Sequence, residues 1–272
     1  MCEMTGNADD VARMRERVRN YPVLVVPGFG APAFQTELVS EHLRSTGLDT
    51  ISVRLPWLAM GDMVRSAGIV GEQARRAVEE RGFEKVNLFG FSLGGLIARY
   101  YLQELEGYPL LGRGAFVSAP YSGTYLGYLG AFSPAGRQVR PGSGLLRRLE
   151  ESGEREHLRG KCLSIFVRWD GVIVPCFSSY LPDGYNILAT KPVTHWRAVT
   201  SRELILHASE FLQGGMPECA VPGRELGQLD AAGRAFAATG TVTRRRVWSV
   251  LYAPFRTFGK RVAGMFRRGG VR

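Results

Sequence analysis

Ser92 stands between glycines in a segment that suits nucleophilic chemistry. Residues 90–94 read Gly-Phe-Ser-Leu-Gly and directly follow the apolar run 86–89. A serine at a sharp strand-to-helix corner has a strained backbone, so the positions two before and two after it must lack colliding side chains. Gly90 and Gly94 meet that need. We expect Ser92 to be a nucleophile; the alternative is a turn serine, because a chain with 34 glycines produces this string by chance.

A serine hydroxyl is a weak nucleophile at neutral pH and needs a base to take its proton. The chain has four histidines. Of these, His195 alone falls in an expected loop between the last strand and the last helix, from which a side chain reaches the edge of a parallel sheet. His207 is the second candidate, although it falls within the last expected helix, where a partly buried histidine is the commoner outcome. We predict His195 as the base.

An acid must orient that base. Asp170 directly follows the apolar run 162–169, so its carboxylate is expected to project from the carboxyl end of a strand. It also falls between Ser92 and His195, which gives the chain order Ser, Asp, His. Asp183 is the rival, but its Pro-Asp-Gly context is typical of a simple turn. We predict that Asp170 holds the imidazole tautomer and stabilises the imidazolium.

Acyl transfer also needs donors for the oxyanion. One expected donor is the backbone N–H of Leu93, at the start of a helix whose dipole favours negative charge. The other is expected from residues 27–30, which read Pro-Gly-Phe-Gly after the first apolar run. Within that loop Phe29 is the first choice and Gly30 the second. The alternative reading is an ordinary glycine-rich connection between a strand and a helix.

Alternating apolar runs and helical periodicities must position these groups. Strands are expected at 21–26, 50–54, 86–89, 114–118, 162–169 and 185–189. Four helices are expected. The first has Phe34, Leu38 and Leu43 on one face, the second runs from an Asp62 cap to Gly82, and the third follows Ser92. The fourth covers 202–212, with Leu204, Leu206, His207 and Phe211 facing inward. This order predicts an α/β protein with a mostly parallel central sheet and helices on both faces.

The length of 272 residues and the 45% hydrophobic content favour one α/β domain with additions. We expect an N-terminal lead-in at 1–20, the domain at 21–213, a linker at 214–240 and a basic amphipathic tail at 241–272. Residues 121–158 break the alternation, so we expect an insertion that forms a lid or cap over the sheet edge. A surface excursion without a role is the alternative.

The insertion combines small and aromatic residues, which suits a groove for an acyl chain. The large apolar residues in it are Tyr121, Tyr125, Leu126, Tyr128, Leu129 and Phe132, with Trp57, Leu58 and Met60 as further candidates from the second strand's loop. We predict Trp57, Tyr121 and Tyr125 as substrate-binding residues. A lid also needs aromatic residues merely to cover the core, and that reading stays open.

The formal charge of +10 first suggests a nucleic-acid partner, but its distribution argues against one. Residues 241–272 hold nine of the 35 basic residues and no acidic residue, which leaves 26 basic and 25 acidic residues elsewhere. From Pro254 the tail has an apolar stripe flanked by basic residues, the composition of a helix that lies on anionic lipid. A helix docked on its own domain or a disordered basic end are the alternatives.

The sequence features that report on localisation point to a cytoplasmic protein, peripheral on a membrane only through its tail. The N-terminus has no apolar stretch of signal-peptide length, and no segment reaches the ~20 apolar residues of a spanning helix. The four cysteines have neither metal-ligand spacing nor the pattern of a disulfide framework. The oligomeric state is not encoded in any pattern that we recognise.

Five segments resemble α/β-hydrolases of the bacterial lipase and esterase type over about residues 21–213. They are 26–30 (Val-Pro-Gly-Phe-Gly), 90–95 (Gly-Phe-Ser-Leu-Gly-Gly), 118–124 (Ser-Ala-Pro-Tyr-Ser-Gly-Thr), 170–175 (Asp-Gly-Val-Ile-Val-Pro) and 194–195 (Thr-His). The resemblance implies an α/β-hydrolase fold. Two positions depart from the family pattern: Pro27 and Tyr121 stand where many such lipases have histidine. These departures weaken the inference of triglycerides over smaller esters.

The leading hypothesis is a serine hydrolase that cleaves lipidic or other hydrophobic esters through an acyl-enzyme. Some lipases of this type hold calcium, but the sequence has no clear acidic cluster, so we expect no metal and no cofactor. An acyltransferase or phospholipase-like enzyme with the same triad is one alternative. A non-catalytic membrane or nucleic-acid adaptor on the same fold is another.

Overall fold

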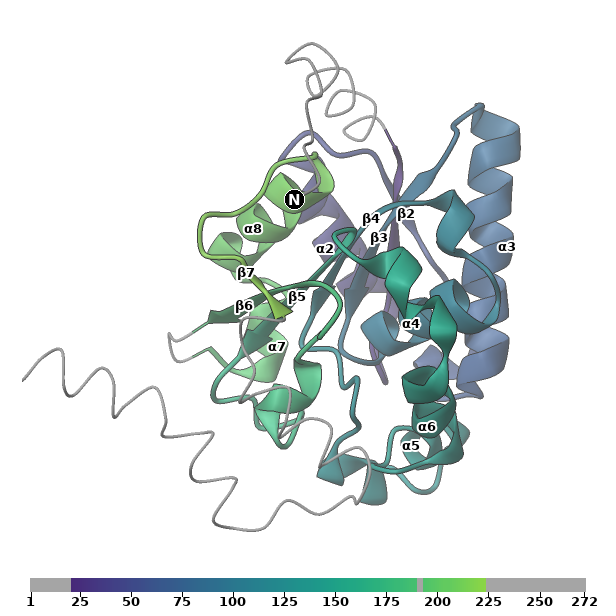
Figure 1. The fold of residues 1–272 in the computed structure, drawn as a ribbon, viewed down its shortest axis with the longest axis vertical. Coiled ribbons are helices and arrows are strands. Elements are labelled where there is room, and N and C mark those ends of the chain that lie inside the picture. Colours follow the sequence, from purple (N-terminus) through teal and green to yellow (C-terminus); the bar gives the residue numbers. More distant parts are fainter. Residues whose placement is uncertain (1–20, 190–192, 224–272) are drawn as a thin grey trace, which may run out of the picture.

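The computed structural model describes residues 21–189 and 193–223. These residues form a seven-stranded sheet, which lies between two helical layers (Figure 1). The strands are β1 (Val23–Val26), β2 (Thr50–Ser52), β3 (Val86–Phe91), β4 (Leu111–Val117), β5 (Cys162–Val167), β6 (Tyr185–Ala189) and β7 (Val221–Pro222). Their order is β2-β1-β3-β4-β5-β6-β7, and all neighbours are parallel except β6 and β7. The expected mostly parallel sheet is confirmed.

Helices cover both faces of the sheet. They are α2 (Ala33–Arg44), α3 (Met63–Arg81), α4 (Leu93–Glu104), α5 (Pro134–Gln138), α6 (Gly144–Glu151), α7 (His195–Ala198) and α8 (Arg202–Leu212), with 3-10 turns η1 (Pro56–Ala59), η2 (Tyr108–Leu110), η3 (Tyr125–Tyr128), η4 (Gly153–Leu158) and η5 (Cys176–Ser179). α3 and α4 pack on one face and α2 and α8 on the other, so each face has its own apolar cluster (Figure 1).

The boundaries of α3 follow from two residues that the sequence marks. The Asp62 side chain accepts a hydrogen bond from the Arg65 N–H at 3.0 Å, which caps the first turn as expected. Gly82 ends the helix with a φ of 68°, a left-handed conformation that glycine adopts without strain. The predicted start and end of this helix are confirmed.

The inward faces of α2 and α8 differ from the expected ones. Phe34 and Leu38 are 69% and 42% exposed, while the α2 residues that face the core are Thr36, Val39, Ser40 and Leu43. In α8, Leu206 is 48% exposed, although Leu204 and Phe211 are buried as expected. Only one side of each helix contacts the sheet, so a large apolar residue a third of a turn away remains in solvent.

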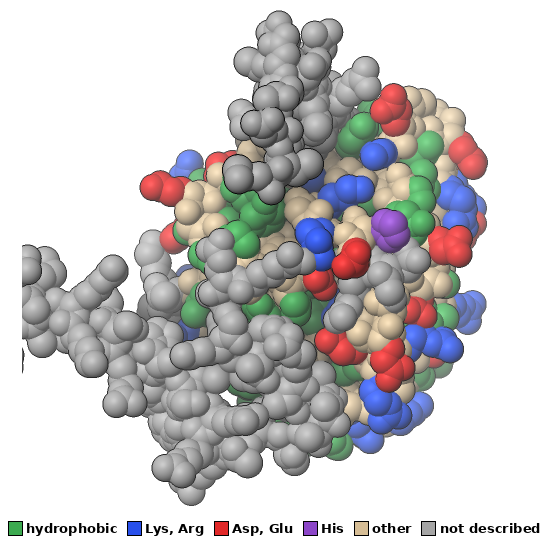
Figure 2. All heavy atoms as spheres, viewed as in Figure 1, with side chains coloured by type: hydrophobic (Ala, Val, Ile, Leu, Met, Phe, Trp, Pro, Cys, Tyr) green, Lys and Arg blue, Asp and Glu red, His purple; other side chains and the backbone are tan. Residues whose placement is uncertain are grey.

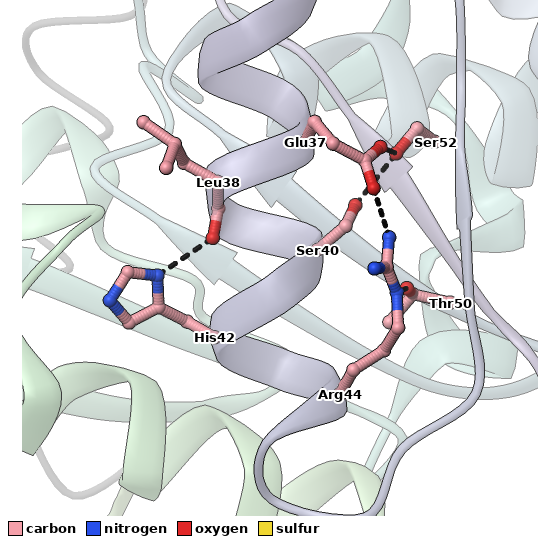
Figure 3. Close-up of polar contacts among 7 residues, drawn as sticks. All are labelled: Glu37, Leu38, Ser40, His42, Arg44, Thr50 and Ser52. Carbon is pink, nitrogen blue, oxygen red and sulfur yellow. Dashed lines mark hydrogen bonds and ion pairs between the residues drawn. The ribbon is translucent and has the colours of Figure 1, made fainter.

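A polar network fixes the edge strand β2 to α2 (Figure 3). The Glu37 carboxylate pairs with Arg44 and accepts a hydrogen bond from Ser52 Oγ at 2.8 Å, and Arg44 Nε donates to Thr50 Oγ1 at 2.8 Å. The bonds from Arg44 and Ser52, together with nearby positive charge, outweigh burial and lower the pKa of Glu37. This network holds α2, the helix that follows the loop after β1, against strand β2.

The insertion at 121–158 packs on α3 and α4 through hydrogen bonds. On its first half, Gln138 Oε1 accepts from the Met63 N–H at 2.8 Å and Gln138 Nε2 donates to Asp62 Oδ2 at 2.7 Å. On its second half, the buried Arg99 of α4 donates to the Leu149 carbonyl oxygen at 3.3 Å and lies 3.6 Å from the Glu150 carboxylate. Both halves of the insertion are therefore bonded to residues of α3 and α4 or of the turn before α3.

The sheet extends past the expected domain limit at residue 213, because β7 pairs with β6 within the segment expected as a linker. The expected lead-in at 1–20, residues 224–240 of the expected linker and the tail at 241–272 lie outside the described residues. Within the described part of the chain, no helix combines the length and apolarity needed to cross a membrane. Figure 2 shows acidic and basic side chains interspersed on the side of the molecule that carries α3.

Candidate active site

Ser92 occupies the sharp corner between β3 and α4, with φ of 53° and ψ of −124°. This is strained backbone for a residue with a side chain. A Cβ built on Gly90 would lie 2.7 Å from the Cα of Gly95, and one built on Gly94 would collide with the Val26 carbonyl oxygen. The two flanking glycines are thus required by close backbone contacts, as the spacing predicts.

Asp170 and His195 form a buried pair at the same edge of the sheet. The distance from His195 Nδ1 to Asp170 Oδ2 is 2.8 Å, and each side chain is 2% exposed. Asp170 follows β5 and His195 opens the short helix α7 after β6, so His195 lies in a helix rather than in the expected loop. Its Nδ1–H donates to the carboxylate, which leaves Nε2 available to take a proton from another group.

The imidazole of His195 packs against the residue that precedes Ser92. The ring centroids of Phe91 and His195 are 4.8 Å apart, with the two planes inclined by 37°. Ser92, Asp170 and His195 follow β3, β5 and β6, and the carboxyl ends of parallel strands meet at one edge of the sheet. The structure therefore brings the three predicted residues to one region, in the expected chain order. Neither His207 nor Asp183 forms this pair.

The other oxygen of Asp170 is held by the loop that follows it. Asp170 Oδ1 accepts hydrogen bonds from the N–H groups of Val172 at 2.9 Å and Ile173 at 2.7 Å. Burial favours the neutral carboxyl, but the hydrogen bond and charge of His195 and these two N–H donors together outweigh it and lower the pKa of Asp170. The carboxylate is therefore ionised at neutral pH.

This lowered pKa predicts how stability depends on pH. The ionised Asp170 stabilises the folded chain at pH values above its ordinary pKa of 3.8, and the contribution disappears as the pH falls through the lowered value. We expect the free energy of unfolding of the wild type to fall more steeply below about pH 4 than that of Asp170→Asn. Urea unfolding at stepped pH measures both curves, and equal slopes would contradict the assignment.

Phe29 and Leu93, the predicted oxyanion donors, line the same cavity as Ser92. A Cβ built on Gly28 would lie 3.1 Å from the Cβ of Ser92, so the loop after β1 packs directly on the corner. Within residues 21–189 and 193–223, the N–H groups of Phe29 and Leu93 have no hydrogen-bond acceptor. The Gly30 N–H, by contrast, donates to the Leu58 carbonyl oxygen at 2.8 Å. Phe29 remains the better candidate.

The turn that supplies this carbonyl is itself strained. Three consecutive residues, Trp57, Leu58 and Ala59, have φ values of 55°, 51° and 58°. A side chain makes the left-handed region unfavourable by roughly 1–2 kcal/mol per residue. The hydrogen bond from the Gly30 N–H to the Leu58 carbonyl oxygen joins this turn to the loop after β1. The side chain of Trp57 is 80% exposed. Trp57 therefore belongs to a strained turn that is hydrogen-bonded to the loop after β1.

A cavity of about 280 Å³ opens beside Ser92. It is lined by Phe29, Ser92, Leu93, Pro120, Thr124, Leu126, Gly127, Leu129, Gly130, Phe132, Gly136, Val139, Val172 and Ile173. None of these residues is charged, and eight of the fourteen come from residues 124–139 of the insertion. The cavity is therefore apolar, and both oxyanion candidates and Ser92 lie on its wall.

The three residues predicted to bind substrate do not line this cavity. The side chains of Trp57 and Tyr125 are exposed, and Tyr121 is 3% exposed within the core, where its ring packs edge-on against Phe116. Burial raises the pKa of Tyr121 well above its usual range. Their neighbours Thr124 and Leu126 line the cavity, and the role of the three predicted residues in binding substrate stays a prediction.

The lining residues that sequence reasoning did not single out come from two places. Val172 and Ile173 follow Asp170 by two and three positions, so their apolar character within the acid loop was a readable signal. Thr124 closes the segment 118–124 noted above, and its hydroxyl faces the same loop. Val139 and Gly136 carried no signal, because only the folding of the insertion brings them to the wall.

Comparison with known proteins identifies the fold. Protein-family models and curated protein sequences gave no match. Aspergillus fumigatus lipase B aligns with a TM-score of 0.65 and 19% identity over 85% of this chain, which spans 62% of the lipase chain. The mature form of Bacillus licheniformis lipase BlEst2 aligns with a TM-score of 0.56 and 15% identity, covering 66% of this chain and 87% of its own.

A third solved structure carries the fold in its name. An alpha/beta hydrolase fold protein from Nakamurella multipartita aligns with a TM-score of 0.50 and 14% identity over 72% of this chain and 93% of its own. With the strand order and the helical layers described above, these alignments establish that the chain has the α/β-hydrolase fold. The expected fold class is confirmed.

Proposed function

We propose that the protein is a serine hydrolase that cleaves carboxylic esters of hydrophobic acids. One observation carries the proposal: a buried, hydrogen-bonded Asp170–His195 pair lies against the strained corner of Ser92, and Ser92 opens onto an uncharged cavity. Strained serine, oriented imidazole and ionised carboxylate are the groups that acyl transfer requires. Two solved structures with this fold are lipases by name, which supports an ester substrate.

The proposed reaction has two halves. His195 Nε2 takes the proton of Ser92 Oγ as that oxygen attacks the ester carbonyl carbon, and the imidazolium then gives the proton to the departing alkoxide. The C–O bond to the alcohol breaks and an acyl-Ser92 ester remains. Water attacks that ester while His195 takes the water's proton, and the proton returns to Ser92 Oγ as the acid leaves. Asp170 fixes the tautomer throughout.

Negative charge develops on the former carbonyl oxygen in both halves. The free N–H groups of Phe29 and Leu93 are proposed to donate to it, and Leu93 is the first residue of α4, where the helix dipole adds to the effect. Preorganised donors of this kind are worth about 3 kcal/mol each in the transition state. The bond from Gly30 to Leu58 holds the Phe29 side of the site in place.

The lining of the cavity indicates the class of substrate. Its volume of about 280 Å³ is just below the usual range for ligand sites, and it offers a hydrophobic acid no ion pair but much apolar contact. The exposed Leu129 and Phe132 extend the apolar wall outward from the cavity. We propose that the acyl chain of the ester occupies this space.

Covalent labelling tests the proposal directly. A fluorophosphonate probe should label the wild-type chain, and peptide mass spectrometry should locate the adduct on Ser92. The same protein should hydrolyse p-nitrophenyl esters, with product analysis in the presence of a competing alcohol separating hydrolysis from acyl transfer. A chain that neither labels nor hydrolyses would instead support a non-catalytic adaptor on this fold.

Filling the cavity should change the preferred chain length. Leu126→Trp places a larger ring in the wall, so we expect kcat/KM for the longest ester that the wild type hydrolyses well to fall by about 10-fold or more. The acetate ester should be hydrolysed nearly as well as before, because it does not reach that wall. Leu105→Trp on the surface is the control. A uniform loss across the series would place the acyl chain elsewhere.

A further inference from the structure

The hydroxyl of Thr124 joins the insertion to the loop that carries the acid. Thr124 is buried and lies on the cavity wall, immediately before η3. Its Oγ1 donates to the Val172 carbonyl oxygen at 2.7 Å and accepts from the N–H of Val174 at 3.0 Å and of Leu126 at 3.3 Å. A threonine hydroxyl has one proton to donate and two lone pairs, so its hydrogen-bonding capacity is fully used.

The loop on the other side of these bonds is the one that holds Asp170. The N–H groups of Val172 and Ile173 donate to Asp170 Oδ1, while the carbonyl of Val172 and the N–H of Val174 face Thr124. Within three residues, the backbone therefore contacts the carboxylate on one side and the hydroxyl on the other. A further bond, from the Tyr125 N–H to the Val174 carbonyl oxygen at 3.0 Å, runs parallel to these.

We propose that Thr124 is a positioning residue, which couples the insertion over the cavity to the orientation of the Asp170–His195 pair. The inference rests on the proposed function. Because Asp170 Oδ2 holds His195 Nδ1, displacement of the loop at 172–174 moves the imidazole relative to Ser92. A misplacement of about 1 Å at a reacting group costs on the order of 100-fold in rate. The segment that shapes the acyl cavity thereby also sets the geometry of the base.

Three substitutions at Thr124 weaken the hydrogen bonds of its side chain by increasing amounts. Thr124→Ser keeps the hydroxyl, Thr124→Cys keeps a weak donor and acceptor, and Thr124→Val keeps the shape alone. Each is assayed on p-nitrophenyl esters, with kcat expressed per site titrated by the fluorophosphonate probe, so that a misfolded fraction does not count. Thr46→Val is the matched control, because Thr46 Oγ1 also lies within hydrogen-bonding distance of a carbonyl oxygen (Leu43, 2.6 Å) and a serine hydroxyl (Ser209, 3.0 Å), but far from the site.

We expect kcat to fall by about 10- to 100-fold in Thr124→Val and by less in Thr124→Cys, with KM nearly unchanged, and to stay near wild type in Thr124→Ser and Thr46→Val. Amide hydrogen exchange should accelerate at residues 172–174 in the order Ser, Cys, Val. If Thr124→Val does not fold, the Cys variant carries the test.

Two results would overturn the inference. One is a kcat per titrated site that stays within about twofold of wild type in both the Cys and Val variants; the other is a loss confined to KM, which would make Thr124 a substrate contact. If the wild-type chain neither labels nor hydrolyses esters, the proposed function fails instead. The exchange rates at 172–174 then decide whether the hydroxyl restrains the acid loop.

Discussion

Replacing Ser92 with alanine is expected to abolish fluorophosphonate labelling and to lower kcat/KM for ester hydrolysis by about 10⁴-fold or more. The reason is chemical: without Oγ no acyl-enzyme forms, and the Asp170–His195 pair has only water to activate. The backbone at this corner already has a φ of 53°, and alanine carries the same Cβ there as serine does. The fold should therefore be retained, and only the chemistry should be lost.

The control for this variant is another buried serine. Ser66 lies on α3, is 2% exposed, and donates its hydroxyl proton to the Asp62 carbonyl oxygen at 3.0 Å. Ser66→Ala should lose about 1 kcal/mol of stability and keep its labelling and its kcat. Circular dichroism and thermal unfolding check that both variants fold. Labelling that survives in Ser92→Ala would show that another residue is the nucleophile.

Gly94→Ala should cause a large loss of stability. A Cβ at this position would collide with the Val26 carbonyl oxygen and would lie 2.7 Å from that of Pro27, and both neighbours are backbone. Neither β1 nor the start of α4 can withdraw without opening the sheet beside Ser92, so we expect a cost of about 3 kcal/mol or more. Any folded fraction should also hydrolyse esters slowly, because the Leu93 N–H would be displaced.

Gly68→Ala provides a matched comparison for helix glycines. Gly68 lies on the exposed side of α3, and a Cβ there would meet nothing within 4 Å. That substitution should raise the free energy of unfolding by about 0.5–1 kcal/mol, since alanine is the better helix former. Urea unfolding of the two variants beside the wild type measures the contrast. Similar stabilities for Gly94→Ala and the wild type would mean that the corner is looser than described.

The succession of strands along the chain and the corner at Ser92 could be predicted because their signals are local. The apolar run before Gly90 and the glycines around Ser92 follow from backbone sterics within a few residues. The pairing of Asp170 with His195 followed from chain order on a parallel sheet, where successive strand ends meet at one edge. Each of these inferences needed only local sequence or the order of segments along the chain.

The walls of the cavity could not be predicted in the same way. Tyr121 was expected beside the substrate but is buried, and Phe34 was expected inside but is exposed. Which side of a short helix or loop faces inward depends on contacts with segments far away in the chain. Val139 and Gly136 reach the cavity only because α5 packs on the start of α3. No periodicity within the insertion encodes that contact.

The guanidinium of Arg99 makes the insertion at 121–158 inseparable from the rest of the domain. This cation is 4% exposed, and its neighbours from α6 are a backbone carbonyl and a carboxylate. Without α6 this buried cation would lose its carboxylate partner Glu150, which is unfavourable. The domain and the insertion at 121–158 thus form one cooperative unit. Replacing the insertion with a foreign one would require redesigning α4 along with it.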